Sequence, residues 1–461
     1  MRITLDIPLS LSEITHNIKS SSKIIDDALI CAITTNSKEV LPGDLFIALT
    51  GEKFNGEDFV SEAKQRGAYV ISTNKENADI LVADTALSLL EIASLYKTQL
   101  SNLKFTIAIT GSVGKSTTKN ILSTILERDY KICSTNENFN NIIGVSYTVL
   151  SAKRNVEILI LELGMNHLGE ISRLSSAIAP DAAIITNIGT AHIGNLGSRA
   201  MIAKAKLEVL DGMRTKRLVV PYEEALLNAH ENSFYTYSIE NKRASIFADI
   251  ICLYSDKSIV NLNSESIKLN HLTIDKPGKH IISAVTASFG IIDLLKIDIS
   301  PICDNTTKIK DNHVRGEYID LGSFKIYEDC YSASYESYIS DFELLSMDKK
   351  GRYSCVIGDM LELGAETEKL HRKVGEMAFK YGFKTIYAFG VYSSFVLSGA
   401  RDAGMNVENI FTNSDITKPE ITAKQILENT RCSETVLIKA SNRVRANRIT
   451  NILKDLRINN A

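Results

Sequence analysis

A short apolar run, a glycine-rich turn and an amphipathic segment follow one another between residues 105 and 127, and few folds contain that succession. Phe105–Thr110 is apolar and rich in β-branched residues, which is typical of a strand buried on both faces of a parallel sheet. Gly111-Ser-Val-Gly114 follows it directly, and Lys115–Glu127 then has the apolar spacing of a helix. The segment therefore predicts the first strand–helix unit of a nucleotide-binding α/β sheet.

The glycine-rich turn also carries the strongest chemical signal. Backbone N–H groups of such a turn, and of the helix that it opens, bind phosphate oxygens. Lys115 adds a positive charge beside the β- and γ-phosphates, and the hydroxyl of Ser116 or Thr117 binds Mg²⁺. Residue 109 is Ile where a full Walker A motif has its first glycine, so a simple turn between strand and helix stays the alternative. The predicted phosphate-binding residues are Gly111, Ser112, Gly114, Lys115, Ser116 and Thr117.

Polar residues stand where two further strands of this sheet are predicted to end. Val156–Leu161 precedes Glu162, and Ala182–Thr186 precedes His192 by a short segment. Ligands of parallel sheets bind at the carboxyl ends of the strands. Glu162 is therefore a candidate Mg²⁺ ligand, because this ion prefers one or two carboxylates with water and phosphate oxygens, although a surface or helix-capping acid would look the same. By pattern alone, His192 is more often a structural residue than a ligand, and Lys206 lies on a solvated helix face.

The chain of 461 residues is long enough for three domains at about 150 residues each. Residues 1–103 mix short apolar runs with turns and predict a small α/β domain. Residues 104–314 contain the phosphate-binding, mostly parallel sheet, with antiparallel hairpins expected over 244–273. Residues 315–461 alternate strands with amphipathic helices, which is typical of a doubly wound, Rossmann-like domain. The predicted fold class is α/β with these three domains.

Composition excludes several classes of protein. Hydrophobic residues make up 44% of the chain and charged residues 23%, as in a folded globular protein. Lys and Arg number 52 against 55 Asp and Glu, a net charge of −3, and no long basic run is present, so we expect no nucleic-acid partner. No apolar stretch approaches the roughly 18 residues that span a bilayer, and the first residues lack a secretory signal pattern. We therefore expect no membrane insertion and a cytoplasmic protein.

Cysteine usage agrees with a cytoplasmic location. The seven cysteines are scattered along the chain and form no C-x-x-C pair. This spacing favours reduced, buried thiols over a disulfide framework or a zinc site.

Taken in chain order, short motifs of this sequence resemble those of the Mur ligases of peptidoglycan synthesis, most closely the type that adds D-alanyl-D-alanine. The resemblance extends over nearly the whole chain, and so many motifs in one order are specific to the family. The motifs are Ser37-Lys38, Leu41–Phe46, Thr110–Thr117, Asn138–Gly144, Glu162–Glu170, Thr186–His192, Lys206–Glu208, Pro277–His280, Arg315–Glu317, Glu328–Tyr331 and Gly358–Gly364.

The resemblance implies an ATP-dependent ligase that forms an amide bond. In this family, the terminal carboxylate of UDP-N-acetylmuramoyl-tripeptide attacks the γ-phosphate, which gives an acyl phosphate and ADP. The amine of D-alanyl-D-alanine then displaces phosphate. Residues 1–103 would bind the UDP-linked substrate, residues 104–314 would bind ATP, and residues 315–461 would close over both. We expect a monomer.

The resemblance also assigns roles to single residues. Lys115 would bind the β- and γ-phosphates, and Ser116 and Glu162 would bind a first Mg²⁺. The lysine that matches Lys206 is carbamylated in the family, which turns a cation into a carboxylate-like group near a second Mg²⁺, with His192 completing that site. These four groups, Lys115, Glu162, His192 and Lys206, form the implied catalytic set. Arg315 would approach the γ-phosphate and Asp329 the ribose, and the UDP-sugar and peptide would face Ser37, Lys38, Asn138, Asn140 and Asn141.

Four motifs depart from the family pattern. Where the family has His-Asn-x-x-Asn, this chain has His280-Ile-Ile-Ser283. An amide that would hold the adenine is therefore missing. Asp-x-Tyr-Asn-Ala-Asn has Ser332 and Ser334 in place of its two amides. Lys-Gly-Ser-Arg appears as Lys439-Ala-Ser-Asn-Arg443, and Asp-Ser-Arg appears as Asn36-Ser-Lys38, which exchanges a bidentate guanidinium for a point charge. The phosphate and metal residues are thus kept, whereas the nucleoside and amine contacts differ.

Three alternatives to a D-alanyl-D-alanine ligase stay open. Ser332, Ser334 and Ala440 favour a paralogous ligase that joins a different amine or carboxylate. A catalytically silent relative that acts as a binding partner is disfavoured, because it would not need the four catalytic residues together. A folylpolyglutamate-synthetase-like enzyme shares the ATP domain, but the amino-terminal domain and the motif Gly358–Gly364 disfavour it.

Overall fold

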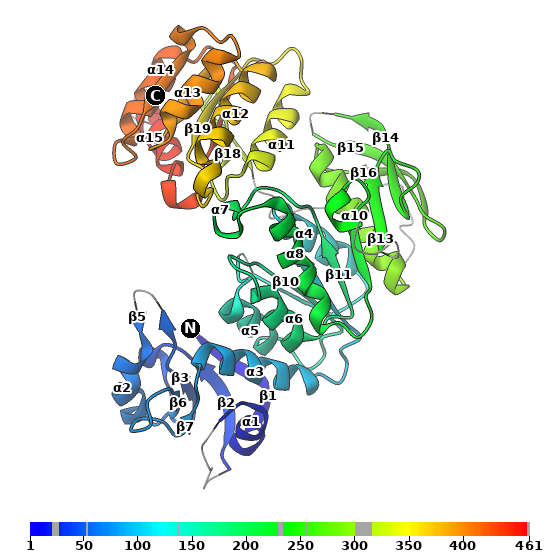
Figure 1. Cartoon of the computed structure of the whole chain (residues 1–461), viewed down its shortest axis with the longest axis vertical. Coiled ribbons are helices and arrows are strands. Elements are labelled where there is room, and N and C mark those ends of the chain that lie inside the picture. The colour runs from blue at the N-terminus through cyan, green and yellow to red at the C-terminus, as the bar shows by residue number, and fades with distance from the viewer. Residues whose placement is uncertain are drawn as a thin grey trace.

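The computed structural model describes residues 1–20, 27–51, 54–136, 138–228, 234–254, 256–299 and 316–458. Within these ranges the chain forms three large sheets in succession, each flanked by helices, and Figure 1 shows them arranged along the long axis of the molecule. The predicted α/β fold with three domains is confirmed. Its boundaries at residues 103 and 314 stay predictions.

The amino-terminal sheet has five strands in the order β1-β2-β3-β6-β7. Strand β1 runs antiparallel to β2, whereas the other neighbours are parallel. Strands β4 and β5 form a separate short hairpin. The elements are β1 (Arg2–Ser10), α1 (Leu11–Asn17), β2 (Leu29–Thr34), β3 (Leu45–Ile47), β4 (Thr50–Gly51), β5 (Phe54–Asn55), α2 (Val60–Gln65), β6 (Tyr69–Ser72), β7 (Ile80–Leu81) and α3 (Thr85–Thr98).

Helix α3 connects this domain to the next. Asp84 caps its first turn by accepting a hydrogen bond from the Leu87 N–H at 2.9 Å. Apolar residues lie on more than one side of the helix, which is typical of a helix that is covered on several faces. The Tyr96 hydroxyl donates to the Ala152 carbonyl oxygen at 2.7 Å, so α3 is fastened to the central domain.

The central sheet has nine strands in the order β16-β15-β14-β13-β12-β11-β8-β10-β9. The pairs from β9 to β14 are parallel, and β14, β15 and β16 form the antiparallel hairpins predicted over 244–273. The elements are β8 (Phe105–Thr110), α4 (Lys115–Leu126), β9 (Ile132–Ser134), α5 (Ile142–Leu150), β10 (Ile158–Glu162), α6 (Glu170–Ile178), β11 (Ala182–Ile185), α7 (Ile193–Leu196), α8 (Arg199–Leu207), β12 (Leu218–Pro221), α9 (Ala225–Asn228), β13 (Tyr235–Ile239), β14 (Ile246–Leu253), β15 (Ser258–Asn263), β16 (Lys268–Ile274) and α10 (Lys279–Leu295).

The position of β8 explains why its residues are apolar without alternation. It lies between β10 and β11. Ile107 and Ile109 belong to the core that contains residues of α4 and α10, whereas Ala108 belongs to the core that contains residues of α5 and α6. Because successive side chains of a strand point to opposite faces, both faces of β8 are buried, as predicted.

The carboxyl-terminal sheet has six strands in the order β17-β18-β22-β19-β20-β21, of which only the pair β17–β18 is antiparallel. Residues of α12 and α13 pack in one core and residues of α14 and α15 in another, as in a doubly wound domain. The elements are β17 (Glu317–Asp320), β18 (Lys325–Asp329), α11 (Tyr335–Ser346), β19 (Tyr353–Gly358), α12 (Thr367–Lys380), β20 (Thr385–Phe389), α13 (Ser393–Asp402), β21 (Ile410–Asn413), α14 (Pro419–Asn429), β22 (Thr435–Lys439) and α15 (Asn447–Ile458).

Two whole-chain expectations can be compared with these elements. No helix in the described ranges has the length and hydropathy needed to span a bilayer. The described cysteines form no disulfide, but the expectation that they are buried is wrong for Cys31 and Cys432, which are exposed, and holds only in part for the half-buried Cys133, Cys252 and Cys330. Cys31 lies on the outer face of β2, where alternate residues are exposed. Cys355 is buried, and Cys303 lies outside the described residues.

Candidate active site

The glycine-rich turn lies between the end of β8 and the start of α4, as predicted. Gly111 has a φ of 148°, in the region that favours glycine. A Cβ atom on Gly111 would lie 1.8 Å from Thr186 Oγ1, so the turn needs glycine for space as well. The amide oxygen of Asn187 accepts hydrogen bonds from the N–H groups of Ser112 (3.0 Å) and Val113 (2.9 Å). These contacts fasten the turn to the end of β11.

A carboxylate and a hydroxyl meet beside this turn. Glu162 is the last residue of β10 and lies opposite Ile109 of β8, with only 1% of its surface exposed. Ser116 Oγ donates to Glu162 Oε2 at 2.7 Å, and Asn140 Nδ2 donates to Glu162 Oε1 at 3.0 Å. Two oxygen ligands next to a helix N-terminus match the preference of Mg²⁺ for a few protein oxygens together with phosphate and water. Ser116 and Glu162 therefore fit the predicted first Mg²⁺ site.

Lys206 is buried in α8, with 2% of its surface exposed, whereas its neighbour Lys204 is exposed. The interpretation as a solvated helix face is thus wrong for Lys206. Burial, and secondly the positive charge of Lys115, hold the pKa of Lys206 well below its usual value. A lowered pKa favours the neutral form of an amine, and it is the neutral form that reacts with CO₂. Lys206 is therefore chemically suited to carrying a carbamate.

His192 immediately precedes α7 with a φ of 63°. Its Nδ1 lies 2.7 Å from Glu362 Oε2 of the carboxyl-terminal domain. Burial, and then the positive charge of Lys115, lower the pKa of His192, with a smaller contribution from Lys206. A neutral imidazole can offer a lone pair to a metal ion, so His192 and a carbamate on Lys206 would fit the predicted second site. Neither predicted site is a complete protein cage, because the described residues contain no group of three or more His, Cys, Asp or Glu that could hold a metal.

One cavity of about 270 Å³ joins these groups to the carboxyl-terminal domain. Its walls come from the ends of β8 and β10, the segments before α5 and α7, and the loops that follow β18, β19 and β22. A larger cavity of about 730 Å³ between the β14–β16 hairpins and the carboxyl-terminal sheet contains none of the predicted site residues, so size does not identify the site. The predicted residues in the wall of the smaller cavity are Ser112, Gly114, Lys115, Ser116, Asn138, Asn140, Glu162 and His192.

Three of the residues that depart from the family pattern also line this cavity, namely Ser332, Ser334 and Asn442, and the retained Ser441 lies beside them. Ser334 caps α11, because its Oγ accepts a hydrogen bond from the Ser337 N–H at 3.3 Å. Ser441 Oγ accepts a hydrogen bond from the Leu361 N–H at 3.2 Å and so links two of the loops. The departures therefore lie in the wall of the site, on the side formed by the carboxyl-terminal domain.

Asp329 and Arg315 are not placed at this cavity. Asp329 ends β18, and its carboxylate accepts a hydrogen bond from Lys439 of β22. The same lysine lies 2.8 Å from Asp341 Oδ2. Asp329 does not line the cavity, and its contact with a ribose stays a prediction. Arg315 lies outside the described residues.

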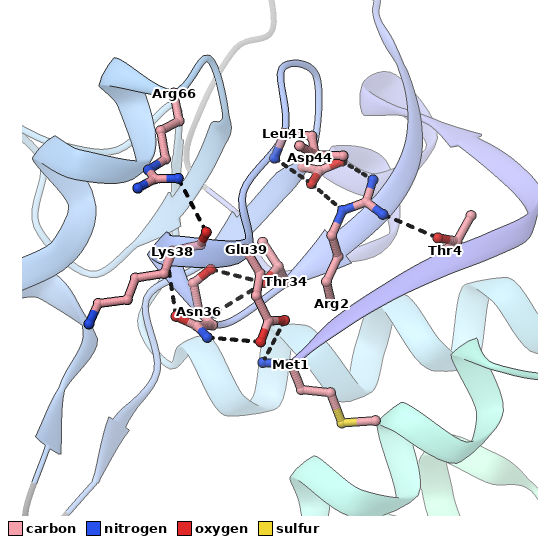
Figure 2. A network of polar contacts seen from close by, with 10 residues as sticks. All are labelled: Met1, Arg2, Thr4, Thr34, Asn36, Lys38, Glu39, Leu41, Asp44 and Arg66. Carbon is pink, nitrogen blue, oxygen red and sulfur yellow. Dashed lines mark hydrogen bonds and ion pairs between the residues drawn. The ribbon is translucent and has the colours of Figure 1, made fainter.

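Three of the predicted substrate-binding residues do not line the cavity either, namely Ser37, Lys38 and Asn141. Ser37 is buried, and its Oγ donates to Glu62 Oε2 at 2.7 Å, so this serine makes a structural contact. Lys38 is exposed, and Figure 2 shows its side chain pointing away from the other labelled side chains, while Arg66 donates to its carbonyl oxygen at 3.2 Å. Asn141 caps α5. Of these candidates, Lys38 is the one whose side chain can meet a ligand.

Two residues to which the sequence assigned no role shape the site. Asn187 holds the glycine-rich turn, and Glu362 reaches His192 from another domain. Both lie inside motifs that carried the family resemblance, just beyond a strand end. The sequence could have indicated these two residues only through their positions at the carboxyl edges of two sheets, where ligands bind.

The family model of the Mur ligase middle domain matches residues 109–292, and that of the Mur ligase family catalytic domain matches residues 29–103. The UDP-N-acetylmuramoyl-tripeptide–D-alanyl-D-alanine ligase of Bacillus subtilis is 30% identical over 442 residues, which cover 94% of each chain. The ligase of the same name from Rickettsia prowazekii is 30% identical over 90% of this chain and 93% of its own.

Solved structures agree with these relatives. The MurF ligase of Thermotoga maritima in complex with ADP is 25% identical, has a TM-score of 0.79, and is matched over 93% of this chain and 98% of its own. MurF from Acinetobacter baumannii is 24% identical, has a TM-score of 0.85, and is matched over 98% of this chain and all of its own, which shows a shared fold.

Proposed function

The chain belongs to the Mur ligase family, and we propose that it is an ATP-dependent ligase that joins D-alanyl-D-alanine to UDP-N-acetylmuramoyl-tripeptide. One observation supports this most. Lys115 and the pair Ser116–Glu162 line one cavity with His192, and the buried Lys206 lies near enough to contribute to the lowered pKa of His192. This set suits a reaction in which two anions must meet, because carboxylate and phosphate repel each other unless positive charge and metal offset them.

The first step joins the substrate carboxylate to phosphate. A carboxylate oxygen forms a bond to the γ-phosphorus, the bond from that phosphorus to the bridging oxygen breaks, and its electron pair leaves with ADP. The Lys115 ammonium and the N-terminus of α4 hold the phosphates, while Ser116 and Glu162 would hold Mg²⁺. When bound, Mg²⁺ supplies positive charge that offsets the charge on the phosphate oxygens.

The second step forms the amide. The amine of D-alanyl-D-alanine attacks the carbonyl carbon of the acyl phosphate, a tetrahedral intermediate forms, and phosphate leaves with the electron pair of the C–O bond, while the amine loses a proton. The loops that follow β18 and β22 form the cavity wall on the side of the carboxyl-terminal domain. We propose that they receive the amine. We also propose that the protein works as a monomer, and that it uses ATP in the cytoplasm.

A second candidate function follows from the altered wall. Ser332 and Ser334 are shorter than the amides that the family places there, so the amine pocket differs in size and in hydrogen-bond donors. A ligase of the same family that joins a different amine is therefore the alternative.

One assay separates the two functions. Purified protein is incubated with ATP, Mg²⁺, UDP-N-acetylmuramoyl-tripeptide and D-alanyl-D-alanine, while phosphate release and product mass are recorded. We expect phosphate and ligated product in equal amounts. Turnover with another dipeptide or amino acid, but not with D-alanyl-D-alanine, would favour the alternative, and no ATP turnover with any amine would favour a silent relative.

A Glu162→Gln variant is expected to need more Mg²⁺ for half-maximal activity, by about 10–100-fold or more, because a neutral amide oxygen is a poorer ligand than a carboxylate. The measurement is product formation against Mg²⁺ concentration. Glu157→Gln is the matched control, because Glu157 precedes the same strand at its opposite end and pairs with Lys104 at 2.8 Å. An unchanged Mg²⁺ requirement in Glu162→Gln would remove this residue from the metal site.

A further inference from the structure

We propose that Glu362 of the carboxyl-terminal domain positions His192 of the central domain, and that His192 is held in one tautomer only when these two domains are docked. The inference rests on the proposed function, since it concerns a histidine of that site. Glu362 is thereby a positioning residue, which acts on the reaction through His192.

The hydrogen bond between the two side chains fixes the tautomer. Nδ1 of His192 lies 2.7 Å from Glu362 Oε2. An ionised carboxylate has no proton to donate, so Nδ1 carries the hydrogen and the lone pair of a neutral ring is on Nε2. Histidines that bind metal ions commonly donate their other ring N–H to a carboxylate in this way, and the carboxylate then sets the orientation of the ring.

The backbones of the two domains interlock at the same place. The N–H of Gly194 donates to the carbonyl oxygen of Glu362 at 2.9 Å. A Cβ atom on Gly194 would lie 2.6 Å from the backbone nitrogen of Gly364, so the two loops approach as closely as glycine allows. The position of the Glu362 side chain is therefore set by how the carboxyl-terminal domain is seated.

Both partners have an unusual backbone conformation. His192 has a φ of 63° and Glu362 a φ of 64°, left-handed values that are uncommon for residues other than glycine, although His adopts them more often than Glu does. Such conformations are strained and persist where the surroundings impose them, commonly at functional sites. Two of them facing each other across a domain junction indicate that the junction is built to aim these side chains.

A second contact crosses the same junction without touching His192. Thr190 Oγ1 donates to Glu336 Oε2 at 3.0 Å. This contact offers a matched control, because removing it deletes one hydrogen bond of the junction but leaves the contact between Gly194 and Glu362 and the partner of the imidazole in place. Glu366 offers another control, since it lies in the same loop region as Glu362 and pairs with Lys369 at 2.7 Å.

The test compares Glu362→Ala and Glu362→Gln with Glu336→Ala and Glu366→Gln. Nitrogen-15 NMR of histidine-labelled protein reports the tautomer, and with eight histidines in the chain the signal of His192 is identified by its loss in His192→Gln. Binding of Mn²⁺ in the presence of a non-hydrolysable ATP analogue, followed by electron paramagnetic resonance, reports the metal site. Neither measurement requires turnover.

We expect His192 to carry its hydrogen on Nδ1 in the wild type and in both controls. Glu362→Ala should give a mixture of tautomers and weaken Mn²⁺ binding by about 10–100-fold, as for the loss of other outer partners of metal ligands. Glu362→Gln should retain the tautomer, because its amide oxygen still accepts the hydrogen bond, and should weaken Mn²⁺ binding less.

Two results would overturn the inference. One is an unchanged tautomer and unchanged Mn²⁺ binding in Glu362→Ala. The other is an equal change in Glu336→Ala, which would mean that domain docking alone matters. If instead the wild type ligates neither D-alanyl-D-alanine nor another amine, the proposed function fails, while the tautomer measurement still decides the role of Glu362.

Discussion

A Lys206→Ala variant is expected to lose ligase activity by about 10²–10³-fold or more, the size of effect seen when a group that stabilises transition-state charge is removed. Lys206 is almost completely buried, and burial together with the positive charge of Lys115 lowers its pKa, which favours the neutral amine over the ammonium. On reaction with CO₂ the amine loses a proton and forms a carbamate, which supplies a negative oxygen ligand. Alanine supplies neither the amine nor the carbamate. The measurement is phosphate release and product mass under saturating substrates.

The control for this variant is Lys204→Ala. Lys204 lies on the same helix but is exposed, so its removal is expected to leave activity unchanged. Partial recovery of Lys206→Ala by formate or acetate would support the carbamate, because a small carboxylate can enter the space left by the side chain. Wild-type protein in ¹³C-bicarbonate should also show a carbamate carbon signal that the variant lacks. Full activity of Lys206→Ala would refute the assigned role.

Much of the fold follows from local sequence patterns. The strands β8, β10 and β11 were predicted because a strand with both faces buried is apolar at every position. Strand β1 was not predicted. Its residues alternate irregularly between buried and exposed, and the register shifts within it, so it has neither the apolar run nor the strict alternation that identifies a strand.

Site residues that stand at the edge of one sheet could be predicted from the sequence. Contacts between distant segments of the chain could not. Ser116 and Glu162 were expected together because both stand at the carboxyl edge of one sheet, and they share a hydrogen bond. The partner of His192 lies 170 residues away and in another domain, so no local pattern indicates it. Ser37 matched a family motif, but its hydroxyl contacts Glu62 because the fold buries it. Motifs predict which residues matter better than they predict which side chain faces the ligand.

Lys439→Met is expected to lower the free energy of unfolding by about 3–5 kcal/mol, the usual cost of removing one partner from a buried ion pair. Lys439 lies fully buried in β22, donates to Asp329, and is 2.8 Å from Asp341 Oδ2. Without the ammonium, two buried carboxylates would face each other with no counter-charge. Methionine retains the length of the side chain, so the loss would come from charge and not from an empty space. The measurement is urea unfolding monitored by circular dichroism.

The charge origin of this loss can be checked by pH. Burial raises the pKa of Asp341 to about 7, although Lys439 opposes the shift. A carboxyl group whose pKa is higher in the folded state lowers stability as pH rises from its unfolded value, about 3.9, to its folded value. Asp341→Asn should therefore remove part of the decline in stability between about pH 4 and 7. Lys439→Met should be least destabilising at the acidic end of that window, where protonation relieves the repulsion between the carboxylates.

The control is Lys424→Ala, an exposed change in the same domain, whose free energy of unfolding should stay within about 0.5 kcal/mol of the wild type. A similarly small effect of Lys439→Met would show that the ion pair is not needed for folding.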